Sequence, residues 1–169
     1  ATLTLDHLSN GRIDFGVGRG NQPAEFERFG VDMNDAYDRF VESLDIIAGV
    51  WSEESYAHEG KFWQFPAVEV APKPLQQPRP PMFMVGVSKR SIRMAAERRM
   101  HGLIGAYLTP LEVTRPSIEL WHATLDELGV PPGELQVAHN EFVYVAESDD
   151  IAKHEAEQGA MWYSEMAGE

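Results

Sequence analysis

The chain of 169 residues contains no cysteine, which excludes disulfides, thiolate metal ligands and cysteine nucleophiles. No apolar run approaches the roughly 18 residues of a membrane span, and no signal-peptide pattern opens the sequence. Basic residues are few: 14 Lys and Arg stand against 27 Asp and Glu, for a net charge of −13. That charge repels phosphate backbones and anionic bilayers, so neither nucleic-acid nor membrane partners are expected. The cytoplasm is the expected location.

Short apolar strands alternate with amphipathic helices along the chain. Strands are predicted near 12–18, 82–86, 102–107 and 135–145. We expect them to run parallel in that order, with 82–85 buried on both faces of the sheet. Parallel β/α units belong to a doubly wound sheet or to a (β/α)8 barrel, and a whole barrel needs about 250 residues. Four units make half a barrel.

The start of the sequence supports that interpretation, because it opens in the middle of a helical pattern and on Ala1 rather than Met. We therefore expect residues 1–169 to be a single domain and an incomplete fragment of a longer protein. Half a barrel exposes apolar surface, so the isolated piece should be unstable or should associate with another chain.

Turn and capping signals mark the helix ends. Ser9-Asn10-Gly11 should end a helix over 2–8. Longer amphipathic helices are predicted over 35–51 and 89–99. For the next helix, a capping box opens at Thr109, Pro116 should delay the start of the regular helix, and Gly129 should end it. Ser148 should be the N-cap of the last helix.

Residues 55–70 predict a β-hairpin with its turn at Glu59-Gly60-Lys61, on the opposite side of the sheet from the glycine loops described below. Five prolines among residues 72–81 then predict a stiff, extended connector. His58 in the hairpin is expected to be solvated, and His101 to be a satisfied residue at a strand boundary. The four tryptophans are expected in the core rather than on a cofactor: Trp51, Trp63, Trp121 and Trp162.

A first glycine-rich loop, Gly16-Val17-Gly18-Arg19-Gly20-Asn21, follows the first predicted strand. Glycines let a ligand approach the backbone, and Arg19 offers a planar fork for a phosphate. The alternative is a tight turn with a solvated Arg19. Asn21 replaces the third glycine of the dinucleotide fingerprint, and no acidic residue ends a strand about 20 positions later, which disfavours a nicotinamide-binding domain.

A second loop, Gly86-Val87-Ser88-Lys89-Arg90-Ser91, joins a strand to a helix. Backbone N–H groups and two hydroxyls would point outward at the positive end of the helix dipole, and such an arrangement suits a phosphate. The alternative is simple N-capping by Ser88. In parallel units both loops lie at the same edge, so adjacent strands would bring Arg19 toward Ser88. The six histidines have neither HxxxH nor HxH spacing, so no metal site is predicted.

These motifs together resemble the bacterial luciferase-like flavin monooxygenase family. The resemblance rests on residues 8–12, 15–20, 25–32, 59–63, 72–76 and 80–81, and extends through essentially the whole chain. Residues 29–34 and 161–163 are most similar to the luciferase branch of the family. The resemblance implies a (β/α)8 TIM barrel in which the present strands are the fourth to the seventh.

The resemblance also implies a cofactor site. Family members bind reduced flavin mononucleotide (FMN) at the carboxyl ends of the strands. Arg19, beside Gly20 and Asn21, matches their phosphate-binding arginine, and Gly86, Val87, Ser88 and Ser91 match their phosphate loop. Luciferase has a glutamate in place of Val87 and a cysteine in place of Gly18, so Val87 contributes only backbone or packing. Gly105, Ala106 and Tyr107 should approach the flavin ring.

The implied activity is that of a monooxygenase, which inserts oxygen from O2 into a small organic substrate such as an aldehyde-like compound. Implied partners are a flavin reductase that supplies reduced FMN, and a second subunit. Two alternatives stay open: an oxidoreductase that uses a deazaflavin, and a non-catalytic flavin-binding subunit of the same fold. The histidine implicated in luciferase precedes the segment present here, so no catalytic residue is assigned.

Overall fold

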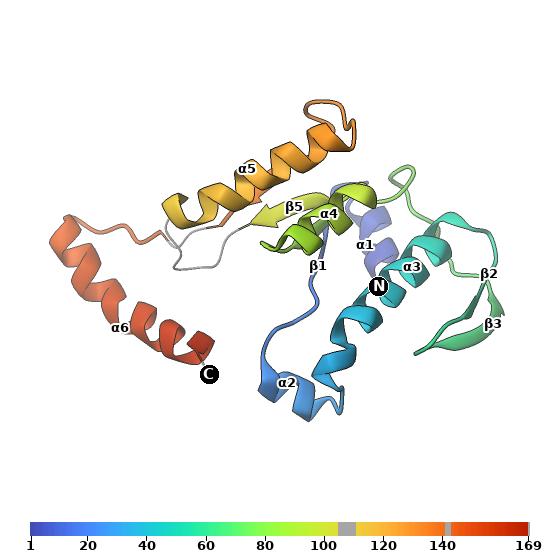
Figure 1. Ribbon diagram of the computed structural model, residues 1–169, viewed down its shortest axis with the longest axis horizontal. Helices are drawn as coiled ribbons and strands as arrows, with labels where there is room; N and C mark the ends of the chain where they lie inside the picture. The colour runs from blue at the N-terminus through green and yellow to red at the C-terminus, as the bar shows by residue number, and fades with distance from the viewer. Residues whose placement is uncertain (105–110, 141–142, 169) are drawn as a thin grey trace. The chain divides into compact units, whose positions relative to one another are not determined.

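The computed structural model describes residues 1–104, 111–140 and 143–168 of the chain (Figure 1). Gly105, Ala106 and Tyr107, expected near a flavin ring, and the expected helix cap Thr109 lie outside these residues. Two compact units are present, Ala1–Phe83 and Met84–Glu169, and each is described by itself. The interpretation of residues 1–169 as one domain stays a prediction.

The first unit holds three α-helices, a short 3-10 helix and a hairpin among the described residues. Its elements are α1 (Thr2–Leu8), β1 (Phe15–Val17), α2 (Pro23–Arg28), η1 (Met33–Asp35), α3 (Ala36–Ser52), β2 (Tyr56–Glu59) and β3 (Gln64–Val68). Strand β4 (Met82–Val85) crosses the boundary between the units. The second unit continues with α4 (Lys89–Glu97), β5 (His101–Ile104), α5 (Leu111–Glu127), β6 (Val137–His139) and α6 (Asp149–Gly168).

The main sheet has the predicted strand order, β1-β4-β5-β6, and β5 runs parallel to β6. The predicted strand over 135–145 is wrong in length, because β6 spans only Val137–His139. Its three residues pair with Gly102, Leu103 and Ile104 of β5. Val143 and Val145 lie outside the strand and are 82% and 86% exposed.

Two further expectations need correction. Strand β4 is not buried on both faces, because Val85 is 49% exposed while Met82 and Met84 are buried. Nor does Pro116 delay α5, which already includes residues from Leu111 onward. Proline removes its own N–H and therefore one hydrogen bond, to the carbonyl four residues earlier. That carbonyl belongs to the exposed Glu112 in the first turn, where water can replace the lost donor.

The core of the first unit forms around α3. Leu44 and Trp51 of this helix, which the sequence predicts to be amphipathic, are buried, and the Phe15 ring lies 5.1 Å from the Trp51 ring. Of the other tryptophans, Trp121 is buried as expected, but Trp63 and Trp162 are exposed, so the expectation of a core position is wrong for these two. Trp63 follows the hairpin turn. The half-buried positions of α6 belong to other residues: Ala152, Ala156, Ala160 and Tyr163.

In the second unit α4 and α5 pack against each other, and both contact β5 (Figure 1). The buried Trp121 ring lies so close to Gly102 that a Cβ there would stand 3.0 Å from it. Arg93 of α4 forms an ion pair with Glu127 near the end of α5. The expected stop at Gly129 is confirmed, since this residue has φ +64° just beyond the helix. The expected cap of α6 is also confirmed, because Ser148 Oγ accepts the N–H of Ile151.

A buried carboxylate ties the proline-rich connector to α1. Asp6 is fully buried and accepts hydrogen bonds from the N–H groups of Leu75 at 2.8 Å and Gln76 at 3.1 Å. The Gln76 side chain donates to the same carboxylate at 3.0 Å and to the Ile13 carbonyl at 2.8 Å. Burial alone would raise the pKa of Asp6, but these hydrogen bonds outweigh it and hold the pKa below 3.8.

We expect Asp6→Asn to lower the melting temperature by several degrees, because an amide cannot accept all of these hydrogen bonds. A lowered folded-state pKa contributes stability above the ordinary value of 3.8, and this stability is lost as the pH falls through the folded value. The acid-induced loss of stability should therefore be smaller in the variant. Thermal melts between pH 3 and pH 7 measure both effects, with the exposed Asp14→Asn as the control. An unchanged melting temperature at pH 7 would show that Asp6 does not hold the connector.

Candidate functional site

The loop between β4 and α4 ends in a reciprocal pair of serines. Ser88 Oγ accepts the N–H of Ser91 at 3.2 Å, and Ser91 Oγ accepts the N–H of Ser88 at 3.1 Å. This is a capping box, which satisfies the first turn of α4 and fixes the direction in which the helix leaves the strand. The interpretation of Ser88 as an N-cap is confirmed.

Gly86 stands where a side chain would not fit. A Cβ at this position would lie 2.5 Å from Ser91 Oγ and 2.6 Å from Ser91 Cβ. The Ser91 side chain fills the space that a side chain of Gly86 would take, and the exposed Lys89 and Arg90 lie at the start of the helix. Backbone N–H groups, hydroxyls and cations arranged in this way suit the terminal phosphate of a nucleotide or flavin.

Two further contacts hold this loop, and one of them escaped the sequence analysis. The N–H of Gly86 donates to the Leu103 carbonyl of β5 at 3.3 Å. Ser117 in α5 donates from Oγ to the Val87 carbonyl, also at 3.3 Å. Nothing local in the sequence links residues 30 positions apart, so only the packing of α5 reveals Ser117.

The loop after β1 lies in the other unit. Arg19, Gly20 and Asn21 are all exposed between the end of β1 and the start of α2. Gly20 has φ +82°, a conformation that favours glycine, and its Cα faces the Phe26 ring. Arg19 therefore lies on an exposed, irregular segment of the first unit, whereas Gly86, Ser88 and Ser91 come together in the second unit. A shared site of the two loops stays a prediction.

The expectation that His58 is solvated is wrong. Its side chain is 14% exposed, and its Nε2 lies 3.0 Å from Oε1 of Glu42, which is 12% exposed. Its Nδ1 lies 3.2 Å from the Tyr56 hydroxyl. Glu42 also accepts the backbone N–H groups of Phe62, at 3.1 Å, and Trp63, at 2.9 Å. Glu42 therefore fastens the hairpin turn to α3.

The electrostatics of Glu42 follow from these contacts. Burial alone would raise its pKa, but the hydrogen bonds from Trp63, His58 and Phe62 outweigh it and hold the pKa below 4.5. Gly60 at the turn is required by the same contact, since a Cβ there would lie 2.0 Å from Glu42 Oε1. Several hydrogen-bond donors from the hairpin thus stabilise the buried carboxylate of Glu42.

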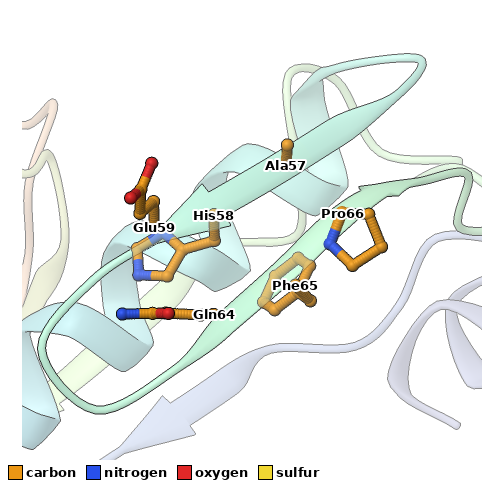
Figure 2. Close-up of a pocket in the computed structure, with 6 residues that line it drawn as sticks. All are labelled: Ala57, His58, Glu59, Gln64, Phe65 and Pro66. Carbon is orange, nitrogen blue, oxygen red and sulfur yellow. The ribbon is translucent and has the colours of Figure 1, made fainter.

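A pocket of about 470 Å³ lies on this hairpin (Figure 2). The lining residues come from β2 and β3: Ala57, His58, Glu59, Gln64, Phe65 and Pro66. None of them belongs to either glycine loop. Both ring nitrogens of His58 are already engaged with Glu42 and Tyr56, which leaves the pocket no free acid or base from this histidine. Size alone therefore does not make it the candidate site.

The remaining histidines support no metal site. His101 Nδ1 accepts the N–H of Gln136 at 3.0 Å, as expected of a satisfied boundary residue. His139 at the end of β6 donates from Nδ1 to the Ile104 carbonyl at 3.0 Å. Over 1–104, 111–140 and 143–168, no group of three or more histidines and carboxylates is arranged to hold a metal ion. Within these same ranges no helix is long and apolar enough to cross a membrane.

The sequence profile described as luciferase-like monooxygenase matches residues 1–168. The chain therefore belongs to the luciferase-like monooxygenase family, with its α/β fold and parallel sheet. One curated relative is the oxygenase component of flavin-dependent trigonelline monooxygenase from Acinetobacter baylyi. It is 36% identical over 116 residues, which cover 68% of this chain and 31% of that protein.

Two solved structures are similar over nearly the whole chain. Monooxygenase RslO1 from Streptomyces bottropensis has a TM-score of 0.87 and 26% identity, covering 99% of this chain and 51% of that chain. The oxygenating constituent of 3,6-diketocamphane monooxygenase from Pseudomonas putida, in complex with FMN, has a TM-score of 0.72 and 25% identity, covering 94% and 47%. The chain thus spans about half the length of these structures and about a third of the curated relative.

Glu42→Ala should release the hairpin turn, because the N–H groups of Phe62 and Trp63 lose their acceptor. We expect amide hydrogen exchange at these two residues to accelerate by about one order of magnitude. In the unsubstituted chain the same exchange should accelerate as the pH falls below 4.5, after correction for intrinsic rates, because protonation removes a carboxylate whose pKa is lowered by folding. Glu59→Ala, an exposed carboxylate in the same hairpin, is the control. Equal protection in both variants would contradict the role of Glu42.

Gly86→Ala should disrupt the capping box, because the new Cβ would overlap Ser91. Loss of an N-cap costs about 1 kcal/mol, which lowers the melting temperature of a chain of this size by about 2–4 °C. Gly16→Ala is the matched control, since a Cβ at that position meets nothing within 4 Å. Thermal melts of the two variants measure the difference, and equal melting temperatures would refute the steric constraint.

Proposed function

We propose that this chain is the phosphate-binding part of a flavin-dependent monooxygenase that uses reduced FMN. Three observations support the proposal: the family match over residues 1–168, a flavin-dependent relative, and a similar structure that contains FMN. The strands β1, β4, β5 and β6 would be the fourth to seventh of a (β/α)8 barrel. Further residues of that barrel would supply the rest of the flavin site.

The observation that carries the proposal is the capped loop from Gly86 to Ser91 at the start of α4. The loop suits a phosphate, because the positive end of the helix and the exposed Lys89 and Arg90 favour an anion there. Gly86, Val87, Ser88 and Ser91 would hold the phosphate from one side, Val87 through its backbone alone. Arg19, with Gly20 and Asn21, would hold it from the other, because a guanidinium forms paired, charge-assisted hydrogen bonds with phosphate.

The serines and the cations have different tasks in this site. The hydroxyls of Ser88 and Ser91 already form hydrogen bonds with each other, so these two residues would act on the phosphate by orienting the helix start. Neutralising the phosphate falls to Arg19, Lys89 and Arg90 in a chain whose net charge is −13. When bound, reduced FMN would supply the reaction with O2 and the transfer of oxygen to a small organic substrate. A flavin reductase would deliver it, and a second subunit or copy would cover the open sheet.

Arg19→Ala should weaken FMN binding by about 10- to 100-fold, since it removes charge-assisted hydrogen bonds to the phosphate. Riboflavin lacks the phosphate and should lose far less affinity. Arg19→Lys should recover only part of the loss, because a point charge replaces a fork. Fluorescence titrations of the wild type and both variants with the two flavins measure these effects.

Arg28→Ala, which removes an exposed arginine of α2 with the same change in net charge, is the matched control. Equal losses for FMN and riboflavin would show that Arg19 does not bind the phosphate. Tighter binding of a deazaflavin than of FMN would show that the cofactor is a deazaflavin and not FMN. Flavin binding without oxygen-dependent turnover in the longer protein would favour a non-catalytic subunit.

A further inference from the structure

Ser117 of α5 reaches the loop of the proposed phosphate site. Its Oγ donates to the Val87 carbonyl at 3.3 Å from a position 30 residues later in the chain. We propose that Ser117 is a positioning residue that holds this loop in the conformation that binds phosphate. This inference rests on the proposed function, because the loop has that role only if it binds the flavin phosphate.

The peptide group between Val87 and Ser88 explains why such a residue is needed. Its carbonyl oxygen is held by Ser117, and its N–H is held on the opposite side by Ser91 Oγ at 3.1 Å. Rotation of this peptide would turn a carbonyl oxygen toward the phosphate, and two negative oxygens repel each other. Ser117 therefore keeps the acceptor of this peptide pointed at α5.

The attachment of Gly86 does not fix this peptide. Gly86 is held through its own N–H to Leu103, one peptide earlier. Glycine tolerates a wide range of backbone dihedrals, so the chain between Gly86 and Ser88 can rotate without steric cost at that position. Val87 is 53% exposed, and its side chain has no polar atom to hold it. Ser117 therefore adds, from α5, a second hold on a peptide whose N–H is held locally by Ser91.

Other helical hydroxyls of this chain behave differently. Thr124 in the same helix donates to its own helix at the Leu120 carbonyl, 2.7 Å away, and Ser43 in α3 donates to the Arg39 carbonyl at 2.8 Å. A hydroxyl four residues after a carbonyl forms that contact easily. Ser117 instead donates across to another segment, which distinguishes it from a hydroxyl that serves only its own helix.

Ser117→Ala should weaken FMN binding by about 3- to 10-fold, the effect of one neutral hydrogen bond, with little change for riboflavin. Amide exchange over residues 87–91 should accelerate in the flavin-free variant. Ser117→Thr keeps the hydroxyl and should restore both properties. Ser43→Ala, which removes a hydroxyl bonded within its own helix, is the matched control and should change neither.

The outcomes separate this inference from the proposed function. If the wild type prefers FMN to riboflavin and Ser117→Ala has the same ratio of the two affinities, the positioning role is wrong and the proposed function stands. Equal losses for the two flavins would reduce Ser117 to a general structural contact and would also overturn the role. If the wild type itself shows no preference for FMN, the proposed function fails and the role fails with it. Unchanged exchange over residues 87–91 would by itself refute the constraint on the loop.

Discussion

The reciprocal hydrogen bonds of Ser88 and Ser91 fix the turn from β4 into α4, and the geometry of the candidate site depends on them. They determine where the helix begins, and they bring Ser91 so close to Gly86 that only glycine fits there. N-capping and phosphate binding are therefore not competing explanations of the motif. The cap orients the helix start, and a ligand would use the backbone and the charges that the cap leaves outside.

In the first unit, two buried acidic residues hold irregular segments of the chain in place. Asp6 and Glu42 each accept several hydrogen bonds from neutral donors in irregular segments, one in the proline-rich connector and one in the hairpin turn. Such segments have N–H groups that no helix or strand satisfies, and a buried carboxylate can accept several of them at once. In both cases the hydrogen bonds lower the pKa against the effect of burial, so the folded chain keeps these groups ionised.

Local signals predict where elements begin and end, whereas contacts between distant residues decide what the elements do. The strand order, the cap at Ser148 and the stop at Gly129 follow from patterns a few residues long, and the structure has all three. The burial of His58 does not, because its partner Glu42 lies 16 residues earlier on another element.

The candidate site likewise has a part that a local motif predicts and a part that depends on distant contacts. Gly86, Ser88 and Ser91 are identified by a local motif, and the structure brings them together, while the pairing of this loop with Arg19 depends on contacts that no local pattern specifies. A net charge of −13 opposes an anionic cofactor, but distant charges are screened within about 8–10 Å at physiological ionic strength. Donors in direct contact with the phosphate are screened much less. In the proposed site, affinity would therefore depend on the few groups that contact the phosphate, and on residues such as Ser117 that position them, more than on the charge of the whole chain.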